Sequence, residues 1–433
     1  MNQTIKDLFS FIQAAKTPFH AVAEAKKLLL EAGFAALNEA DEWNLLPGHA
    51  YFTDRNGSAL IAFRLPENEP DGFQIVASHS DSPSFKIKEN AELASDVYVR
   101  LNVEPYGGMI CSSWFDRPLS VAGRVLVKTE TGVETRLISF DKDLLMIPNV
   151  AIHMNRSVNS GYAYNMAVDM MPLFGDGNAK GAFKKLVAEE AGCAADDILG
   201  NDLFLYNRMP GTEWGEANEF ISAPRLDDLE CAFSSLSALI SADNPRSVAV
   251  AAILDNEEVG SGTKQGADSD FLPSVLHRVA AALGKEADFT RMTANSFMVS
   301  ADNAHAVHPN HPEYADPTHR PAMNGGIVIK FNANQKYTTD GVSNALFEIL
   351  CKRACVPYQF FANRSDLPGG STLGNISNTH VSMNTVDIGL PQLAMHSAYE
   401  TAGAKDPDFL IAALKEVFLA SVKAKGNGSY TLL

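Results

Sequence analysis

The stretch SVAVAAIL at residues 247–254 decides the fold class, and it runs directly into the acidic segment DNEE at residues 255–258. A short, continuous run of small and apolar residues is typical of a strand that is buried on both faces. Helical patterns at 226–241 and 272–283 flank this run, and another strand pattern follows at 296–301. Such alternation predicts an α/β fold in which helices cover a mixed sheet.

The same alternation extends outward to both ends of the chain. Two helices open the sequence and end near Gly33, and the helical pattern returns at 343–354 and from 409 to about 424. The remaining strand patterns are short and rich in apolar or β-branched residues; they lie at 59–65, 73–78, 326–331, 358–361 and 386–390.

Residues 92–222 have a different character, with β-type runs such as 121–128, a turn-rich stretch at 175–178 and one helix around 183–191. This segment predicts an inserted β-rich domain. Residues 1–91 and 223–433 would then form one discontinuous α/β domain.

Composition excludes several classes of protein. The chain has 433 residues, 46% of them hydrophobic, and a formal net charge of −17, which argues against nucleic acid or an anionic membrane as the main partner. It contains no apolar run long enough to span a membrane, and its start does not resemble a signal peptide. Its five cysteines are scattered without a CxxC pair. We therefore expect a cytoplasmic protein.

Acids and histidines follow the predicted strands at the points where the strands end. In open α/β sheets, functional groups gather just beyond the carboxyl ends of the strands. A further acid pair, Asp227 and Asp228, begins a predicted helix. The residues in these positions are His79, Asp81, Asp227, Asp228, Glu257, Glu258, Asp302 and His396.

Two histidines and several carboxylates at one sheet edge suit a pair of divalent cations, because imidazole and carboxylate are ligands for zinc and related metals. The spacing of His79 and Asp81 fits a ligand and the carboxylate that orients its ring. Of the adjacent acids Glu257 and Glu258, one can coordinate while its neighbour stays free as a base.

Each of these motifs alone has an ordinary structural interpretation, such as a solvated turn, a helix N-terminus or a buried core histidine. A competing zinc trio at His305, His308 and His311 is interrupted by Pro309 and Pro312, which break any helix that would align the three rings. The chain has no Gly-x-Ser-x-Gly motif and no complete phosphate loop. The joint placement at strand ends favours the two-metal hypothesis.

Five segments of the chain resemble the aspartyl aminopeptidases, a family of co-catalytic metallo-aminopeptidases that is related to the tetrahedral aminopeptidases. The segments occur in the family's order and span nearly the whole chain: SHSDSP at 78–83, PRLDDL at 224–229, DNEEVGS at 255–261, SADNAHAVHPN at 300–310 and PQLAMHS at 391–397.

The resemblance assigns roles to the candidate residues. Asp227 matches the carboxylate that bridges both metals, Glu257 the general base and Asp81 the partner that orients a ligand. Where the family usually has Asn, this chain has Asp228, so either acid of the pair could form the bridge. The terminal metal ligands match His79, Glu258, Asp302 and His396.

Two further positions acquire roles by resemblance. Lys330 matches a lysine that meets the acidic side chain of the substrate's N-terminal residue; the alternative is a strand lysine that faces solvent. His153 matches a histidine that the smaller domain inserts into a neighbouring subunit's site; the alternative is a structural histidine.

The family implies an α/β metallopeptidase domain interrupted by a β-rich dimerisation domain, with twelve subunits in a tetrahedral shell built from dimers. It also implies two divalent cations per subunit, with zinc first and cobalt or manganese as alternatives. The expected reaction is release of N-terminal residues, preferably Asp or Glu, from peptides by a metal-held hydroxide. The alternatives are a preference for neutral residues, a related deacylase, or a metal-stabilised scaffold without turnover.

Overall fold

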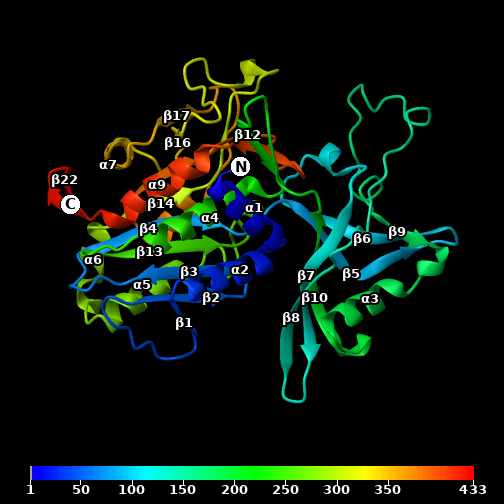
Figure 1. The fold of residues 1–433 in the computed structure, drawn as a ribbon, viewed down its shortest axis with the longest axis horizontal. Helices are drawn as coiled ribbons and strands as arrows, with labels where there is room; N and C mark the ends of the chain where they lie inside the picture. The colour runs from blue at the N-terminus through cyan, green and yellow to red at the C-terminus, as the bar shows by residue number, and fades with distance from the viewer. Residues whose placement is uncertain (1) are drawn as a thin grey trace. The chain divides into compact units, whose positions relative to one another are not determined.

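The computed structural model describes residues 2–433, and these divide into two compact units. Among these residues, the larger unit contains 2–81, 211–395 and 400–433, while the smaller unit contains 82–210 together with 396–399. The chain therefore leaves the α/β unit and returns to it (Figure 1).

A nine-stranded mixed sheet is the centre of the larger unit. Its strand order is β1-β2-β3-β13-β4-β14-β18-β16-β17, so neighbours in space come from distant parts of the sequence. The strands are β1 (Ala35–Leu37), β2 (Ala50–Arg55), β3 (Ala59–Arg64), β4 (Gly72–His79), β13 (Ser247–Leu254), β14 (Phe297–Ala301), β16 (Ile327–Phe331), β17 (Tyr358–Ala362) and β18 (Asn384–Gly389).

Four central strands of this sheet run parallel. β4 pairs in parallel with both β13 and β14, and β14 pairs in parallel with β18. Parallel strands end at the same edge of a sheet, so the segments that follow them begin close together. This arrangement brings His79, at the end of β4, beside the segments that follow β13 and β14.

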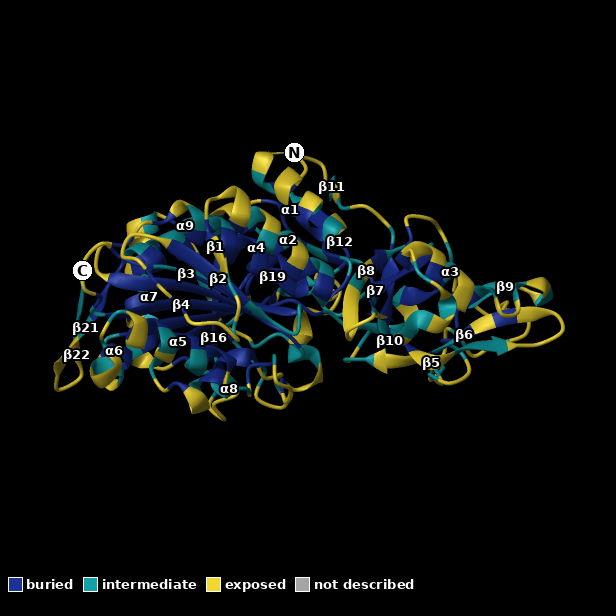
Figure 2. Cartoon of the chain, turned by 90° about the horizontal axis from the view of Figure 1, so that it is seen from below, coloured by how far each residue is buried: buried dark blue, intermediate teal, exposed yellow. Residues whose placement is uncertain are grey.

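Helices cover both faces of the sheet (Figure 2). In β13, Ala249, Ala251 and Ile253 belong to the core on one face, whereas the alternate residues Val248 and Val250 belong to the core on the other. The first face is covered by α1 (Gln3–Ala14), α2 (Pro18–Glu31), α4 (Leu226–Ser241), α7 (Gly341–Ala354) and α9 (Asp406–Leu419). The second is covered by α5 (Phe271–Ala282), α6 (Phe289–Ala294) and α8 (Leu373–His380).

Two smaller sheets complete the larger unit. One has five strands in the order β11-β12-β20-β19-β15, and the other is the C-terminal hairpin. Their strands are β11 (Thr212–Trp214), β12 (Phe220–Ala223), β15 (Ala304–His305), β19 (Pro391–Leu393), β20 (Glu400–Gly403), β21 (Val422–Gly426) and β22 (Ser429–Leu432).

The smaller unit is a six-stranded antiparallel sheet with its own hydrophobic core. The order of its strands is β8-β7-β10-β5-β6-β9, and Phe183 and Val187 of helix α3 (Ala182–Ala191) pack into the core. The strands are β5 (Ser84–Ala94), β6 (Tyr98–Tyr106), β7 (Leu119–Lys128), β8 (Val133–Ser139), β9 (Leu173–Asp176) and β10 (Ile198–Asn207).

The predicted fold class, a helix-covered mixed sheet with a β-rich insertion, is confirmed. The observed division between the units differs from the predicted insertion at 92–222. The smaller unit already begins at Ser82, because β5 pairs with β6 and β10. Its long continuous segment ends at Pro210, because β11 and β12 join a sheet of the larger unit through β20.

The last helix is shorter than predicted. α9 ends at Leu419 rather than near Ala424, and the chain continues into the hairpin of β21 and β22. The two residues of its turn, Asn427 and Gly428, both have positive φ, which is the backbone that an Asn-Gly hairpin turn needs. The Asn-Gly pair is therefore the sequence signal for the hairpin, whose first strand overlaps the end of the predicted helix.

Within residues 2–433, every helix is too short or too polar to cross a bilayer.

Gly389, at the end of β18, allows a close approach of two backbone segments. A Cβ atom at this position would lie 1.9 Å from the carbonyl oxygen of Asp302. We expect Gly389→Ala to lower the free energy of unfolding by about 1–3 kcal/mol, because the backbone must move to relieve the overlap. Urea unfolding measures the change.

Gly341→Ala is the matched control, since a Cβ atom at Gly341 would meet nothing within 4 Å. Its stability should equal or slightly exceed that of the parent, because alanine restricts the unfolded chain. Equal stabilities for the parent and Gly389→Ala would show that this backbone contact imposes no constraint.

Candidate metal centre

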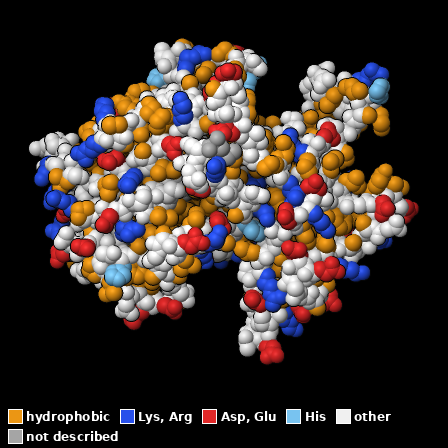
Figure 3. Space-filling model, in the orientation of Figure 1, with side chains coloured by type: hydrophobic (Ala, Val, Ile, Leu, Met, Phe, Trp, Pro, Cys, Tyr) orange, Lys and Arg blue, Asp and Glu red, His pale blue; other side chains and the backbone are white. Residues whose placement is uncertain are grey.

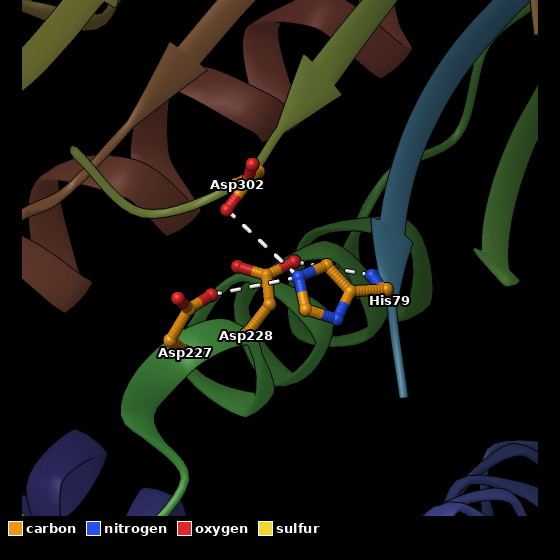
Figure 4. Close-up of side chains that lie close together, drawn as sticks. All are labelled: His79, Asp227, Asp228 and Asp302. Carbon is orange, nitrogen blue, oxygen red and sulfur yellow. Dashed lines mark hydrogen bonds and ion pairs between the residues drawn. The ribbon is translucent and has the colours of Figure 1, made fainter. Parts of the chain in front are cut away.

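Three chain segments meet at this site, one carrying a histidine and two carrying acids. His79 ends β4, Asp302 follows β14, and Asp227 and Asp228 lie at the start of α4, where they are joined by a cis peptide bond. All four residues are buried, and at least one ligand atom of each lies within 4.8 Å of those of the others (Figure 4). The structure thus brings three of the six predicted acids together around His79 from segments that are far apart in sequence.

The imidazole of His79 faces these acids through Nε2. Nε2 lies 3.5 Å from Oδ1 of Asp227 and 3.8 Å from Oδ1 of Asp302. These distances are long for hydrogen bonds. Two ligands that are each about 2.0–2.2 Å from one zinc ion in tetrahedral geometry lie about 3.3–3.6 Å apart. The spacing is therefore close to that of ligands around a shared cation.

Asp81 faces the other nitrogen of the same ring. Nδ1 of His79 lies 3.1 Å from the backbone oxygen of Asp81 and 3.3 Å from its carboxylate. The Asp81 carboxylate also accepts hydrogen bonds from the backbone N–H groups of Glu257 and Glu258, each at 3.2 Å. Asp81 therefore orients the His79 ring and anchors the turn that follows β13.

That turn carries Glu257 and Glu258 in a short 3-10 helix. Asn256, the residue before this helix, has a left-handed backbone conformation. The Asn256 side-chain oxygen accepts hydrogen bonds from Thr263 and Gln265, which fold the following loop back over the turn. Ligand atoms of Glu257, Glu258 and His79 also lie within 4.8 Å of one another. The site therefore offers two neighbouring groups of potential ligands that share His79.

Burial of so many acids shifts their protonation. Burial raises the pKa of Asp228 well above its usual value, and the negative charges of Asp302 and Asp227 add to the shift. Burial raises the pKa of Glu257 to about 8, although the nearby His79 opposes the rise. For His79, burial alone would lower the pKa, but the surrounding carboxylates, Asp228 first, overcome it and raise the value.

This excess of buried negative charge fits a cation. Isolated buried charges are costly in free energy, and a bound metal ion neutralises them directly. The donors are imidazole nitrogen and carboxylate oxygen, which suit zinc. The chemistry of these side chains therefore matches a zinc site.

Lys330, on β16, reaches the same region from the sheet. Lys330 is 2% exposed, and its ammonium donates to the carbonyl oxygens of Asp302 at 2.8 Å and Asn303 at 3.3 Å. It also lies 3.6 Å from the carboxylate of Asp302 and over the ring of Tyr337. Burial alone would lower the pKa of Lys330, but Asp302 overcomes it and raises the value. The solvent-facing alternative for this lysine is therefore wrong.

Two predicted site residues, His396 and His153, belong to the smaller unit. His396 has a positive φ, and its Nδ1 lies 2.7 Å from the carbonyl oxygen of Gly108. His153 is exposed in a loop between β8 and β9. Hydrophobic side chains are prominent at the tip of this loop, with Val150, Ile152 and Met154 all exposed (Figure 3).

The competing histidine trio lines a separate pocket of about 420 Å³ in the larger unit. The rings of His308 and His311 have centroids 5.4 Å apart, and Nδ1 of His311 lies 2.9 Å from the carboxylate of Glu313. Among residues 2–433, neither these two histidines nor His305 occurs in a group of three potential metal ligands.

Sequence reasoning missed a buried polar network behind Asp227. The carboxylate of Glu400 accepts a hydrogen bond from the Asp227 backbone N–H at 3.0 Å, and Glu230 lies one turn along α4 from Asp227. Burial and the negative charge of Asp406 raise the pKa of Glu230 well above its usual value. The available signal is that Glu230 is the only charged residue of this helix after its first turn.

The fold and these side chains define a class, the α/β metal-dependent hydrolases with imidazole and carboxylate ligands. A family model described as aminopeptidase I zinc metalloprotease (M18) matches residues 11–418. The chain belongs to this M18 family and is a metallo-aminopeptidase.

Relatives of similar length support the assignment. A probable M18 family aminopeptidase 2 from Clostridium acetobutylicum is 47% identical over 423 residues, which cover 95% of this chain and 98% of that protein. A protein of the same description from Pseudomonas aeruginosa is 41% identical over 423 residues, with 96% and 97% covered.

Solved structures agree in fold. A chain in the complex of Ape4 and Nbr1 superposes with a TM-score of 0.93 at 36% identity, and the match covers 96% of this chain and 85% of that one. The S. cerevisiae mApe1 dodecamer superposes with a TM-score of 0.84 at 29% identity, with 96% of each chain covered.

The raised pKa of Glu230 predicts a pH-dependent stability in metal-free protein. The native state holds a proton on Glu230 at pH values where the unfolded state has released it, so stability falls as pH rises above the ordinary glutamate pKa. Glu230→Gln removes this titration. Urea unfolding of chelator-treated protein from pH 5 to pH 9 should show a growing advantage for the variant, approaching about 1.4 kcal/mol per pH unit.

The control is Glu286→Gln, which changes an exposed glutamate in the same way. Its stability should follow that of the parent at every pH. If Glu230→Gln also ran parallel to the parent, the protonated state assigned to Glu230 would be wrong.

Proposed function

We propose that this metallo-aminopeptidase removes N-terminal Asp or Glu residues from peptides with the help of two bound divalent cations, zinc in the first place. The main support is the convergence of Asp227 and Asp302 on Nε2 of His79, whose Nδ1 faces Asp81. Family membership supplies the reaction class, the release of N-terminal residues.

The proposed ligands are His79, Glu258, Asp302 and His396, with Asp227 as the bridge between the two ions. Asp228 remains the alternative bridging acid, because both carboxylates of the pair are buried beside His79. The backbone N–H of His79 donates to Asp228 at 3.1 Å, which occupies one Asp228 oxygen and favours Asp227 as the bridge.

When bound, zinc ions would polarise the scissile carbonyl and favour deprotonation of a water. The chain supplies the proton carrier. Glu257 takes a proton from the attacking water as the water oxygen bonds to the carbonyl carbon, and passes it to the amine nitrogen as the C–N bond breaks. The backbone N–H of Glu257 donates to Asp81, which holds the base in place.

The acidic preference is proposed on Lys330. It places a buried positive charge 3.6 Å from the carboxylate of Asp302, one of the acids grouped around His79. That charge favours a substrate whose first side chain is negative. The preference rests on electrostatic attraction, because the ammonium already has two carbonyl partners on this chain.

An assembly of twelve subunits built from dimers is also proposed. One solved relative is a dodecamer, and the loop that carries His153 exposes apolar side chains of the kind that subunit contacts cover. In such an assembly, His153 would enter a neighbouring subunit's site. The scattered cysteines, all of them free thiols, support a cytoplasmic location.

Hydrolysis of a panel of aminoacyl substrates tests the reaction. Purified protein should release Asp and Glu fastest, lose activity on chelation and regain it with zinc. Glu257→Gln should lower kcat about 10²- to 10⁴-fold, because the proton carrier is lost, while bound zinc stays at the parental level. Metal-replete parent protein that released no amino acid would overturn the function, and a fully active Glu257→Gln would overturn only the assignment of the base.

Lys330→Met tests the acidic preference, because methionine keeps the length of the side chain but not its charge. Loss of a charge interaction should lower kcat/KM for Asp substrates about 10- to 100-fold more than for Ala substrates. Steady-state kinetics with both substrates measure the ratio. An equal fall for both would assign Lys330 to support of the site rather than to selectivity.

A further inference from the structure

Asn303 is a buried amide that connects the two acid-bearing segments of the site. It directly follows Asp302, between β14 and β15, and is 3% exposed. Its backbone neighbours hold this loop to the sheet, since Asp302 N–H donates to Ile388 at 3.1 Å and Ala304 N–H donates to Leu390 at 2.8 Å. Its side chain points to other elements.

Nδ2 of Asn303 carries two N–H groups, which are shared among three acceptors. Two of these lie on α4, namely the carbonyl oxygen of Leu226 and a carboxyl oxygen of Glu230, each 3.2 Å from Nδ2. The third is the side-chain oxygen of Gln392 on β19, at 3.0 Å. The side-chain oxygen of Asn303 accepts from the thiol of Cys231 at 3.2 Å. One side chain thus joins the Asp302 loop to the first two turns of α4 and to β19.

We propose that Asn303 is a positioning residue that sets the spacing between Asp302 and the Asp227–Asp228 pair. Leu226, one of its partners, directly precedes Asp227, so a change at this bond moves the acid pair relative to Asp302. The inference rests on the proposed metal site. Asn303 would affect metal affinity rather than contact the substrate.

The amide is suited to this place because it donates and accepts at once. An aspartate would put a carboxylate beside the buried Glu230 and would lose the donors to Leu226 and Gln392. A leucine of similar size would leave three buried acceptors and the Cys231 thiol without this partner, and buried polar groups without partners are costly. Either change favours movement of α4 away from the Asp302 loop.

Preformed spacing matters for metal binding, because ligands that are already in place lose less conformational freedom on binding. Residues that orient metal ligands typically change affinity about 10- to 100-fold when they are replaced. We expect a loss of this size for Asn303→Leu. Competition with a chromophoric chelator measures zinc affinity directly, without substrate.

Asn244→Leu is the matched control. Asn244 is also 3% exposed and ties elements together through the carbonyls of Phe418 and Ala420 at 2.7 and 2.6 Å, but it lies at the opposite end of α4, beyond Ser241. Its replacement should lower the urea midpoint of unfolding while zinc affinity stays unchanged. Comparing the two variants separates an effect on the placement of the metal ligands from a general loss of stability.

Weaker zinc binding by Asn303→Leu alone would support the inference. Affinity within twofold of the parent, or equal weakening by both variants, would overturn it. If Asn303→Leu does not fold, Gln392→Met is the substitute, because it removes a single acceptor of the Asn303 side chain. Weaker zinc binding by this variant would support the inference, and affinity equal to that of the parent would overturn it. The expected loss of zinc affinity is smaller than for Asn303→Leu. Failure of the parent protein to bind zinc would instead count against the proposed function.

Discussion

The burial of several carboxylates around the single imidazole of His79 is the constraint on which the rest of the structure depends. Parallel strands β4 and β14 deliver His79 and the Asp302 segment to one sheet edge, and α4 begins there with Asp227 and Asp228. Like charges at such short distances repel strongly in a region from which water is excluded. The long strands and helices behind this edge supply the apolar packing that holds the acids together.

The sequence predicted the parts of this arrangement that depend on local pattern. The helix at 226–241 and the strand at 247–254 have the same bounds in the structure as in the prediction. Both elements are buried along almost all of their length, and the apolar run of the strand ends at the polar segment 255–258. The acids after the strands were found for the same reason, because parallel strands carry whatever follows them to one edge.

The parts that escaped prediction depend on partners that are distant in sequence. Asn303 and Glu400 are ordinary polar residues until the fold brings them against α4. The limits of the smaller unit follow from the pairing partners of β5 and β12, which a single sequence does not identify. The end of α9 was missed because the apolar pattern continues into β21, while the signal that ends the helix is the later turn at Asn427 and Gly428.

Lys330 lies where one positive charge supports the site and would also serve the proposed substrate preference. Its ammonium is almost fully buried, and two of its three donors are directed at the carbonyls of Asp302 and Asn303. That arrangement compensates the charge of Asp302 and restrains the loop that Asn303 ties to α4. An acidic substrate would feel the same positive charge without displacing these bonds. In the proposed function, selectivity for acidic substrates and support of the site would therefore be coupled through a single charge.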